Sequence, residues 1–328
     1  MGVAGLILLQ SASGFAAASA GEKDSPDNRR FEFVYETEIG PIGEGQGPVE
    51  VFVPLPRADR YQRVLSVDIE ANIPGQIEQE AQYGNRYWRG SLERSAGSPI
   101  EIEVRTVVAR SASPHVNAEM SSDPVRALDP DLFLSANERV VVNHPILEPI
   151  QKEIRASTSA QDKASLARAI YDWVVDNVEY KKVGPGWGNG DTFWACNERY
   201  GNCTDFHSLY ISLARTEGIP ARFDMGFPVP EDRTSGRIGG YHCWVEFYLP
   251  EKGWIAIDAS EASKAPDKRD AFYDRRAGDR IHFTTGRDLR LGKDHQDRPL
   301  NYFIYPYVEV AGQAYDESIR QSFSFSER

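Results

Sequence analysis

The chain has 328 residues, of which 41% are hydrophobic and 26% are charged. This composition excludes a disordered polymer, a collagen-like repeat and a multi-span membrane protein, and the length fits two domains with hydrophobic cores. The 37 basic and 49 acidic side chains give a formal net charge of −12. Because a field of this sign repels polyanions, we expect no nucleic-acid partner.

The N-terminal segment has the pattern of a secretory leader. Val3–Leu9 is a short apolar run, and Ala18-Ser19-Ala20 before Gly21 fits the small-x-small cleavage rule, although the Lys or Arg that usually begins a leader is absent. Neither this run nor any later one reaches the roughly 18 apolar residues of a membrane span. We predict a signal peptide over residues 1–20, a linker over 21–30 and a periplasmic or secreted protein. The alternative for this segment is a disordered tail.

The next 80 or so residues have the alternation of antiparallel strands. Apolar and polar side chains alternate in 31–36, 49–53 and 100–104, and Gly/Pro clusters at 40–48 and 73–75 indicate turns. Short alternating strands without helical runs predict an N-terminal antiparallel β-sandwich. We place this domain at residues 31–112 and a Pro-, Ser- and Asp-rich connection at 113–158.

Two helices and several strands are predicted in the second half. An apolar i, i+4 stripe at Leu166, Ile170 and Val174 predicts a helix near 159–178 that begins at Ser159 or Asp162. Asn202 is a suitable N-cap for a second helix over 203–217, after an ordered Gly- and Trp-rich loop at 184–201. Strands are predicted at 221–227, 240–249, 254–258, 281–285 and 302–310, and Pro250–Gly253 forms the turn of a hairpin.

Three side chains in this half have the chemistry of a thiol nucleophile and its base. Cys203 lies in the first turn of the second helix, where unpaired N–H groups and the helix dipole favour a thiolate. His242, in a strand, is the best candidate base, and a third group must orient its ring. In a hairpin whose turn centres near Glu251, residue 242 lies opposite 258–260, so Asp258 falls within reach of His242. Local rules do not fix the distance from Cys203 to His242.

These residues lie in four blocks whose order and spacing resemble the transglutaminase-like proteins of the papain-like superfamily. The blocks are Gly201-Asn202-Cys203-Thr204-Asp205-Phe206, Gly218-Ile219-Pro220-Ala221-Arg222, Tyr241-His242-Cys243-Trp244-Val245-Glu246 and Gly253-Trp254-Ile255-Ala256-Ile257-Asp258. The resemblance covers roughly 160–262. Segments 31–110, 283–291 and 299–312 resemble an exported bacterial subgroup with an N-terminal β domain.

The resemblance implies an α+β protein in which the β-sandwich precedes a transglutaminase-like domain at 159–328 with a C-terminal extension. It implies a nucleophile helix packed on an antiparallel sheet, with Cys203 as nucleophile, His242 as base and Asp258 as orienting group. The reaction would be acyl transfer from a protein or peptide carboxamide through a thioester, or its hydrolysis. Because the sequence has no dense Asp/Asn loop of the EF-hand kind, we expect no metal, and we expect no cofactor. The Cys203 N–H is one expected oxyanion donor, and Trp187 and Trp194 are candidates for the other.

Several alternatives remain at this stage. The same triad serves a cysteine protease or amidase, and a catalytically silent peptide-binding module could use the same cleft. His207, one turn after Cys203, either lines the cleft or, as we favour, is a core or helix-surface histidine. Cys203, His207, His242 and Cys243 are also zinc-ligand types, but adjacent strand residues point to opposite faces. For the same reason we expect Cys243 to face away from the cleft, as a small buried side chain or as a disulfide partner of Cys196.

Overall fold

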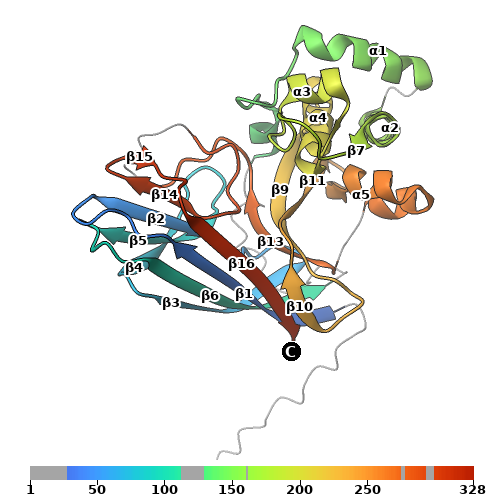
Figure 1. Ribbon diagram of the computed structural model, residues 1–328. Helices are drawn as coiled ribbons and strands as arrows, with labels where there is room; N and C mark the ends of the chain where they lie inside the picture. The colour runs from blue at the N-terminus through green and yellow to red at the C-terminus, as the bar shows by residue number, and fades with distance from the viewer. Residues whose placement is uncertain (1–27, 112–128, 160–161, 275–277, 293–298) are drawn as a thin grey trace, which may run out of the picture.

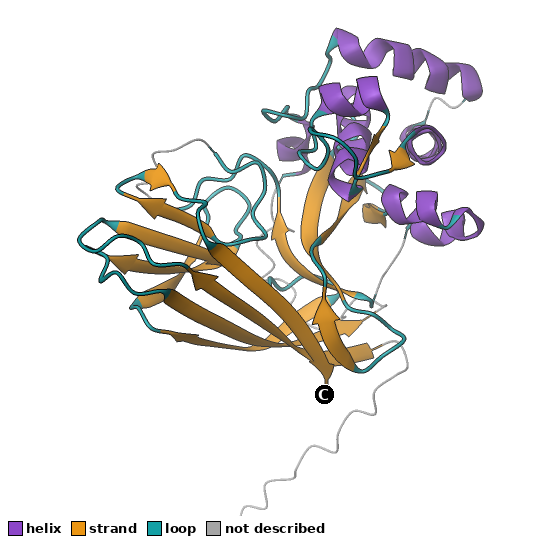
Figure 2. Ribbon diagram, in the orientation of Figure 1, coloured by secondary structure: helices purple, strands orange, loops and turns teal. Residues whose placement is uncertain are grey.

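The structure is a computed structural model that describes residues 28–111, 129–159, 162–274, 278–292 and 299–328. The predicted signal peptide, residues 21–27 of the predicted linker and part of the predicted connection lie outside the described residues. Strands form most of one half of the molecule and the helices gather in the other half, beside a further sheet (Figures 1 and 2). The predicted α+β class is therefore confirmed.

The first sheet is antiparallel, with strand order β10-β16-β1-β6-β3. Its strands are β1 (Asn28–Ile39), β3 (Gln62–Ala71), β6 (Ile100–Ser111), β10 (Ser235–Ile238) and β16 (Ile319–Glu327). The predicted alternation is present in β1, where Phe31, Phe33 and Tyr35 are buried. Because β1 pairs with β6 on one side and β16 on the other, it is a central strand of this sheet.

The second sheet is also antiparallel, with strand order β15-β14-β2-β5-β4. Its strands are β2 (Val49–Pro54), β4 (Gly75–Gln79), β5 (Arg86–Leu92), β14 (Tyr307–Val310) and β15 (Gln313–Ala314). Val49, Val51 and Val53 of β2 belong to the same buried cluster as Phe33 and Tyr35 of the first sheet. The two sheets therefore share one hydrophobic core, as in the expected sandwich.

The C-terminal strands complete these two sheets, which differs from the expected layout. The sequence assigned residues after 299 to an extension of the second domain, yet β14 pairs with β2, and β16 pairs with β1 along its whole length. Phe323 and Phe325 of β16 are buried on the same face as Phe33. Pairing between strands almost 300 residues apart leaves no local signal in the sequence, so only the fold reveals it.

The third sheet lies under the helices, in the order β12-β11-β9-β13. Its strands are β9 (Ala221–Pro228), β11 (His242–Leu249), β12 (Gly253–Ile257) and β13 (Arg280–Thr285), and a short parallel pair is formed by β7 (Glu179–Tyr180) and β8 (Tyr200–Gly201). The helices are α1 (Glu148–Ser157), α2 (Lys163–Asn177), α3 (Thr192–Glu198), α4 (Cys203–Thr216) and α5 (Ala259–Lys264). Helix α4 packs on β9 and β11, the arrangement that the resemblance implied.

Three of these helices were not predicted, namely α1, α3 and the short α5 that follows the hairpin. Helix α1 lies in the expected connection, where Ile150 and Ile154 form a buried i, i+4 pair. Pro149 in its first turn resembles a loop residue in sequence, although proline is tolerated there. Helix α3 lies in the expected Gly/Trp loop and is capped by Asp191. Helix α2 agrees with the prediction, and Asp162 is its N-cap.

The helical half and the sandwich are joined through a continuous core. Phe227 of β9 packs against Phe33 of β1 and Phe323 of β16, with ring centroids 5.1 and 4.3 Å apart. Strand β10, between β9 and β11 in the chain, also pairs with β16. The sheet that carries the candidate site is therefore held directly by the N-terminal sandwich.

A buried polar cluster reinforces this joint. His282 of β13 is 2.9 Å from Asp59 through Nδ1 and 3.5 Å from Asp224 through Nε2. Burial would raise the pKa of Asp224, but Arg222 and His282 outweigh it and lower the pKa to about 2. The same carboxylates raise the pKa of His282 above its ordinary value despite burial. Charged groups from both halves thus neutralise one another out of water.

In the described part of the chain, no helix has both the length and the apolar character needed to cross a bilayer.

Candidate active site

Cys203 is the first residue of α4, as predicted. The Asn202 side chain accepts a hydrogen bond from the Thr204 N–H at 2.9 Å, and Asp205 accepts one from the Asn202 N–H at 2.9 Å. This reciprocal capping fixes the start of the helix. As the first helical residue, Cys203 has an N–H with no acceptor inside the helix. The sulfur therefore lies beside a free backbone donor at the positive end of a 14-residue helix.

Asp205 also holds the Gly/Trp loop over the start of α4. Its two oxygens accept hydrogen bonds from the N–H groups of Gly188, at 2.6 Å, and Gly190, at 3.0 Å. From the other side, the fully buried Arg287 donates to the carbonyls of Asn189, at 2.9 Å, and Gly190, at 3.1 Å. The loop is thus fixed through both its donors and its acceptors.

His242 and Asp258 meet at the end of the β11–β12 hairpin. The ladder pairs Leu249 with Gly253 and Val245 with Ile257, which continues to the predicted neighbourhood of His242 and Asp258. Nε2 of His242 is 2.6 Å from Oδ2 of Asp258. The other ring nitrogen, Nδ1, is then left to face the Cys203 sulfur, with which the ring interacts. The structure therefore brings the three predicted residues together.

The electrostatics of this group favour an ion pair. A hydrogen bond from Cys243 lowers the pKa of Cys203, burial opposes it, and His242 lowers the pKa further, to well below 9. Burial would lower the pKa of His242, but Asp258 and Cys203 raise it to about 10. Between these two values the favoured state is a thiolate beside an imidazolium.

Asp258 is itself held in place by several donors. One oxygen accepts hydrogen bonds from the Ser260 hydroxyl at 3.0 Å and the Glu261 N–H at 3.1 Å, because Asp258 also caps α5. Arg280 donates to the other oxygen at 3.4 Å. Burial would raise the pKa of Asp258, but His242 and Arg280 outweigh it and keep the pKa well below 3.8. Arg280 could not be singled out from the sequence, because β13 follows the hairpin by more than 20 residues.

His207 is a core residue, which agrees with the favoured prediction. Its side chain has no exposed surface, and burial lowers its pKa to about 4. Nδ1 lies 3.5 Å from the Cys243 sulfur and Nε2 lies 3.6 Å from Oδ1 of Asp258. His207 therefore lies beneath the candidate site, between Cys243 and Asp258, and does not line an open cleft.

The expectation that Cys243 faces away from the site is wrong. Side chains do alternate along β11, but α4 packs on the face that carries Cys243 and Phe247. The ring centroids of Tyr210, on α4, and Phe247 are 6.2 Å apart. The Cys243 sulfur therefore lies against the first turns of α4, 3.8 Å from the Thr204 hydroxyl and 3.5 Å from Nδ1 of His207, and both Cys243 and His242 influence the pKa of Cys203. All three cysteines are free thiols, so Cys196 and Cys243 are not bonded to each other.

The two tryptophan candidates differ. The Trp194 indole N–H donates to the Tyr200 carbonyl at 2.9 Å, which occupies its single donor, so Trp194 is not an oxyanion donor here. Trp187 directly precedes Gly188 in the loop held by Asp205, and Lys182 lies 5.9 Å from its ring. Trp187 therefore remains the candidate for the second donor.

Tyr241 is a site residue that the sequence analysis did not single out. Its hydroxyl contacts the Asn202 amide at 3.0 Å and the Thr204 hydroxyl at 2.8 Å. Tyr241 therefore links the strand that carries His242 to the helix start that carries Cys203. Its position next to His242 in the chain was the available signal.

Among the described residues, no group of three or more His, Cys, Asp or Glu side chains is arranged to hold a metal ion.

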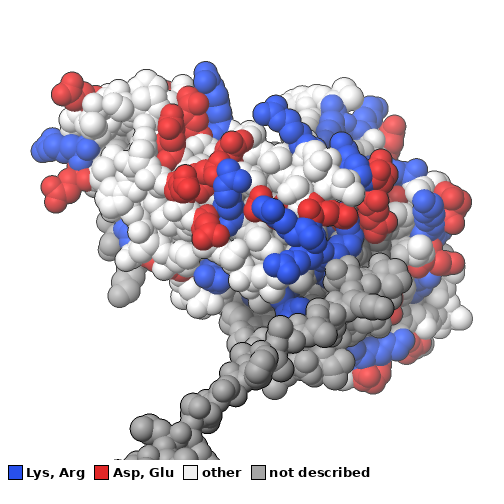
Figure 3. Space-filling model, turned by 90° about the horizontal axis from the view of Figure 1, so that it is seen from below, with Lys and Arg blue, Asp and Glu red and all other residues white. Residues whose placement is uncertain are grey.

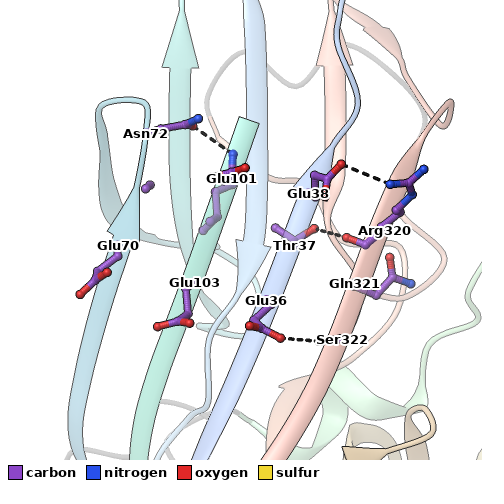
Figure 4. A pocket seen from close by; sticks show the side chains of 12 residues that line it. Glu36, Thr37, Glu38, Glu70, Asn72, Glu101, Glu103, Arg320, Gln321 and Ser322 are labelled. Carbon is purple, nitrogen blue, oxygen red and sulfur yellow. Dashed lines mark hydrogen bonds and ion pairs between the residues drawn. The ribbon is translucent and has the colours of Figure 1, made fainter. Parts of the chain in front are cut away.

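A shallow acidic hollow lies on the outer face of the first sheet, away from this site. Carboxylates from three neighbouring strands project into it (Figure 4), namely Glu36, Glu38, Glu70, Glu101 and Glu103. Arg320 of β16 pairs with Glu38 at 3.4 Å. On the face shown in Figure 3, Lys and Arg side chains lie among Asp and Glu side chains. The hollow includes none of the three predicted catalytic residues.

Comparison with known proteins agrees with this geometry. Residues 151–259, which include Cys203, His242 and Asp258, match the transglutaminase-like superfamily. The chain therefore carries a transglutaminase-like domain, a fold of thiol enzymes. The match covers about a third of the chain and leaves the sandwich outside it.

Individual relatives extend over different parts of the chain. An uncharacterized protein of Haemophilus influenzae is 25% identical over 338 residues, which cover 91% of this chain and 90% of that protein. A protein-glutamine gamma-glutamyltransferase of Pseudomonas aeruginosa is 26% identical over 164 residues, which cover 48% of this chain but only 23% of that enzyme. The solved structure of a proposed cysteine protease from Cytophaga hutchinsonii has a TM-score of 0.56 at 18% identity and covers 92% of this chain and 98% of its own. This last likeness shows a shared fold over both halves.

Proposed function

We propose that this protein is a thiol enzyme that transfers or hydrolyses acyl groups of protein or peptide carboxamides, with Cys203 as nucleophile, His242 as acid and base, and Asp258 as orienting group. The observation that carries the proposal is the 2.6 Å contact between His242 and Asp258 beside a cysteine at a helix start. A structural histidine would not need a charged partner on one nitrogen and a low-pKa thiol on the other.

The proposed reaction begins with the thiolate of Cys203. It attacks the carboxamide carbon, and the resulting oxyanion accepts a hydrogen bond from the Cys203 N–H. The imidazolium of His242 gives its proton to the leaving amine, which leaves a thioester on the enzyme. A second nucleophile, deprotonated by the now neutral His242, then attacks the thioester. An amine gives a cross-link and water gives hydrolysis.

Trp187 is proposed as the second oxyanion donor, because its loop is fixed over the start of α4 by Asp205. Loss of one such donor costs on the order of 100–1000-fold in rate. Trp187→Phe keeps an aromatic side chain, although a smaller one, and removes the indole N–H. A fall in kcat with little change in KM would support the role, whereas unchanged kcat would exclude it.

The test of the function offers a glutamine peptide to the purified full chain, with and without a labelled primary amine, and follows the products by mass. Amine incorporation identifies a transglutaminase, loss of ammonia alone identifies an amidase, and backbone cleavage identifies a protease. Cys203→Ser should abolish each activity, and Cys196→Ser, on α3, is the matched control. If none of the products forms and Cys203 alkylates no faster than Cys196, the proposal fails in favour of a silent peptide-binding module.

We also propose that the enzyme works outside the cytoplasm, in the periplasm or after secretion. The support is the leader pattern that ends at Ala20. N-terminal sequencing of the protein from a periplasmic extract should begin at Gly21, and an uncleaved cytoplasmic product would contradict this.

A further inference from the structure

Cys243 is a buried thiol next to the proposed nucleophile, and the proposed reaction does not use it. It has no exposed surface, and its sulfur lies 3.5 Å from Nδ1 of His207 and 3.8 Å from the hydroxyl of Thr204. Thr204 and His207 lie one and four residues after Cys203 in α4, so the Cys243 thiol lies beside the helix turn that begins at Cys203, and the two thiols influence each other's pKa. A second thiol therefore lies next to the helix start that carries the proposed nucleophile.

We propose that Cys203 and Cys243 form a reversible disulfide that switches the enzyme off when a peroxide reaches the site. This inference rests on the proposed function in one respect. A small reagent must be able to reach the sulfur of Cys203, which is 3% exposed. It adds a modification site and a form of regulation to the same centre.

The chemistry balances in two steps. The Cys203 thiolate attacks the peroxide, the O–O bond breaks, and the products are a Cys203 sulfenic acid and, after protonation, an alcohol or water. The sulfur of Cys243 then attacks the sulfenic sulfur, the S–O bond breaks, and the S–S bond forms. The thiol proton of Cys243 leaves with the hydroxyl group as water. The peroxide is thus reduced by two electrons and the two thiols are oxidised.

His207 is placed to move the proton in the second step. A neutral thiol is a poor nucleophile, and burial raises the pKa of Cys243 well above its ordinary value. His207 is kept neutral by burial, so its Nδ1 can accept the Cys243 proton at 3.5 Å. The imidazolium that forms is stabilised by Asp258, 3.6 Å from Nε2. A buried, uncharged histidine between a thiol and a carboxylate thereby has a role.

Cys196 is a built-in control for this proposal. It lies on α3, is only partly buried, and its pKa is raised to about 11 by burial. It therefore resembles an ordinary unreactive thiol. Trypsin separates the three cysteines, because cleavage after Lys182, Arg199, Arg215, Arg237 and Lys252 places them in peptides 183–199, 200–215 and 238–252.

The experiment treats the folded full chain with a small excess of hydrogen peroxide, blocks free thiols with iodoacetamide and measures the mass before and after dithiothreitol. We expect a loss of about 2 Da, a cross-link between peptides 200–215 and 238–252, and full return of both thiols on reduction. In Cys243→Ser, we expect Cys203 to gain about 32 Da as a sulfinic acid that dithiothreitol does not reverse. Cys196→Ser should behave as the unaltered protein.

Two results would overturn the proposal. One is over-oxidation of Cys203 in the unaltered protein without the 200–215/238–252 cross-link, and the other is a cross-link that includes peptide 183–199. If Cys243→Ser does not fold, the cross-linked peptide in the unaltered protein still decides. The glutamine assay is read separately: acyl transfer without the disulfide refutes only this inference, and the disulfide without acyl transfer refutes only the proposed function.

Discussion

Replacement of Asp258 by asparagine tests the electrostatic basis of the site most directly. Asparagine has nearly the same shape and is an equally good N-cap, so α5 should keep its hydrogen bond from the Glu261 N–H. Against the effect of burial, Asp258 and Cys203 together raise the pKa of His242 from 6.5 to about 10, and the change removes the larger of these two influences. At 1.36 kcal/mol for each pKa unit, the imidazolium loses about 5 kcal/mol of stabilisation if its pKa returns to the ordinary value.

The consequence reaches Cys203 through His242. A neutral imidazole no longer favours the thiolate, so the pKa of Cys203 should rise and its alkylation at pH 7 should slow by about tenfold or more. At pH 10, where the thiol of the variant also ionises, the rate should approach that of the unaltered protein. Acyl transfer should fall on the order of 10²–10⁴-fold, because the proton donor is lost as well.

The assay is the pseudo-first-order rate of iodoacetamide labelling of peptide 200–215, measured from pH 4 to 10. Asp59→Asn is the matched control, because it removes a carboxylate from another buried histidine, His282. The control should leave the labelling profile of Cys203 unchanged. A profile for Asp258→Asn that coincides with the unaltered protein, in a variant with native circular dichroism, would refute the reasoning.

Three further outcomes are expected. Acyl transfer should decline above about pH 10, because His242 then loses the proton that it gives to the leaving amine. Alkylation of Cys203 needs no acid and should not decline. A parallel decline of both rates would contradict the assigned roles. Arg287→Gln should lower the free energy of unfolding by about 1–3 kcal/mol in a urea titration, because buried carbonyls at Asn189 and Gly190 lose their donor. In the control Arg320→Gln, at an exposed side chain, the free energy of unfolding should change by less than about 0.5 kcal/mol. The stability contributed by Asp224 and His282 should be greatest between about pH 4 and pH 6.5. The lowered pKa of Asp224 gives stability that is lost as the pH falls toward 2, and the raised pKa of His282 gives stability that is lost as the pH rises past 6.5. Melting temperatures across this range check the last prediction, and His282→Gln should flatten the alkaline side.

Part of the site could be predicted because it is built from local rules. The cap at Asn202 sets the start of α4 and hence the place of Cys203 at the end of a helix dipole. The turn at 250–253 fixes the register of the hairpin. Because the numbers of two paired residues in a hairpin have a constant sum, His242 lies opposite the segment that begins at Asp258. Both features depend on residues that are neighbours in the chain, so the sequence is sufficient to predict them.

Other parts could not be predicted, because they depend on which surfaces come together. The alternation of side chains along a strand predicts that His242 and Cys243 lie on opposite faces of β11. It does not predict which of the two faces packs against α4. The loop at 184–190 was predicted, but its attachment to Arg287 joins residues about 100 positions apart. Helix α1 was missed because its apolar stripe is only two residues long and begins beside a proline.

The sequence by itself thus determined the class of fold, the strands that alternate, the start of α4 and the pairing of His242 with Asp258. Only the tertiary structure decided that the last strand completes the first sheet, that the Cys243 thiol lies against the first turns of α4, and that Arg280 and His207 flank the Asp258 carboxylate. The physical reason is the separation along the chain over which each kind of interaction acts. Capping, alternation and turn geometry act over a few residues, whereas burial joins any two apolar or polar surfaces that fit, whatever their separation in the chain.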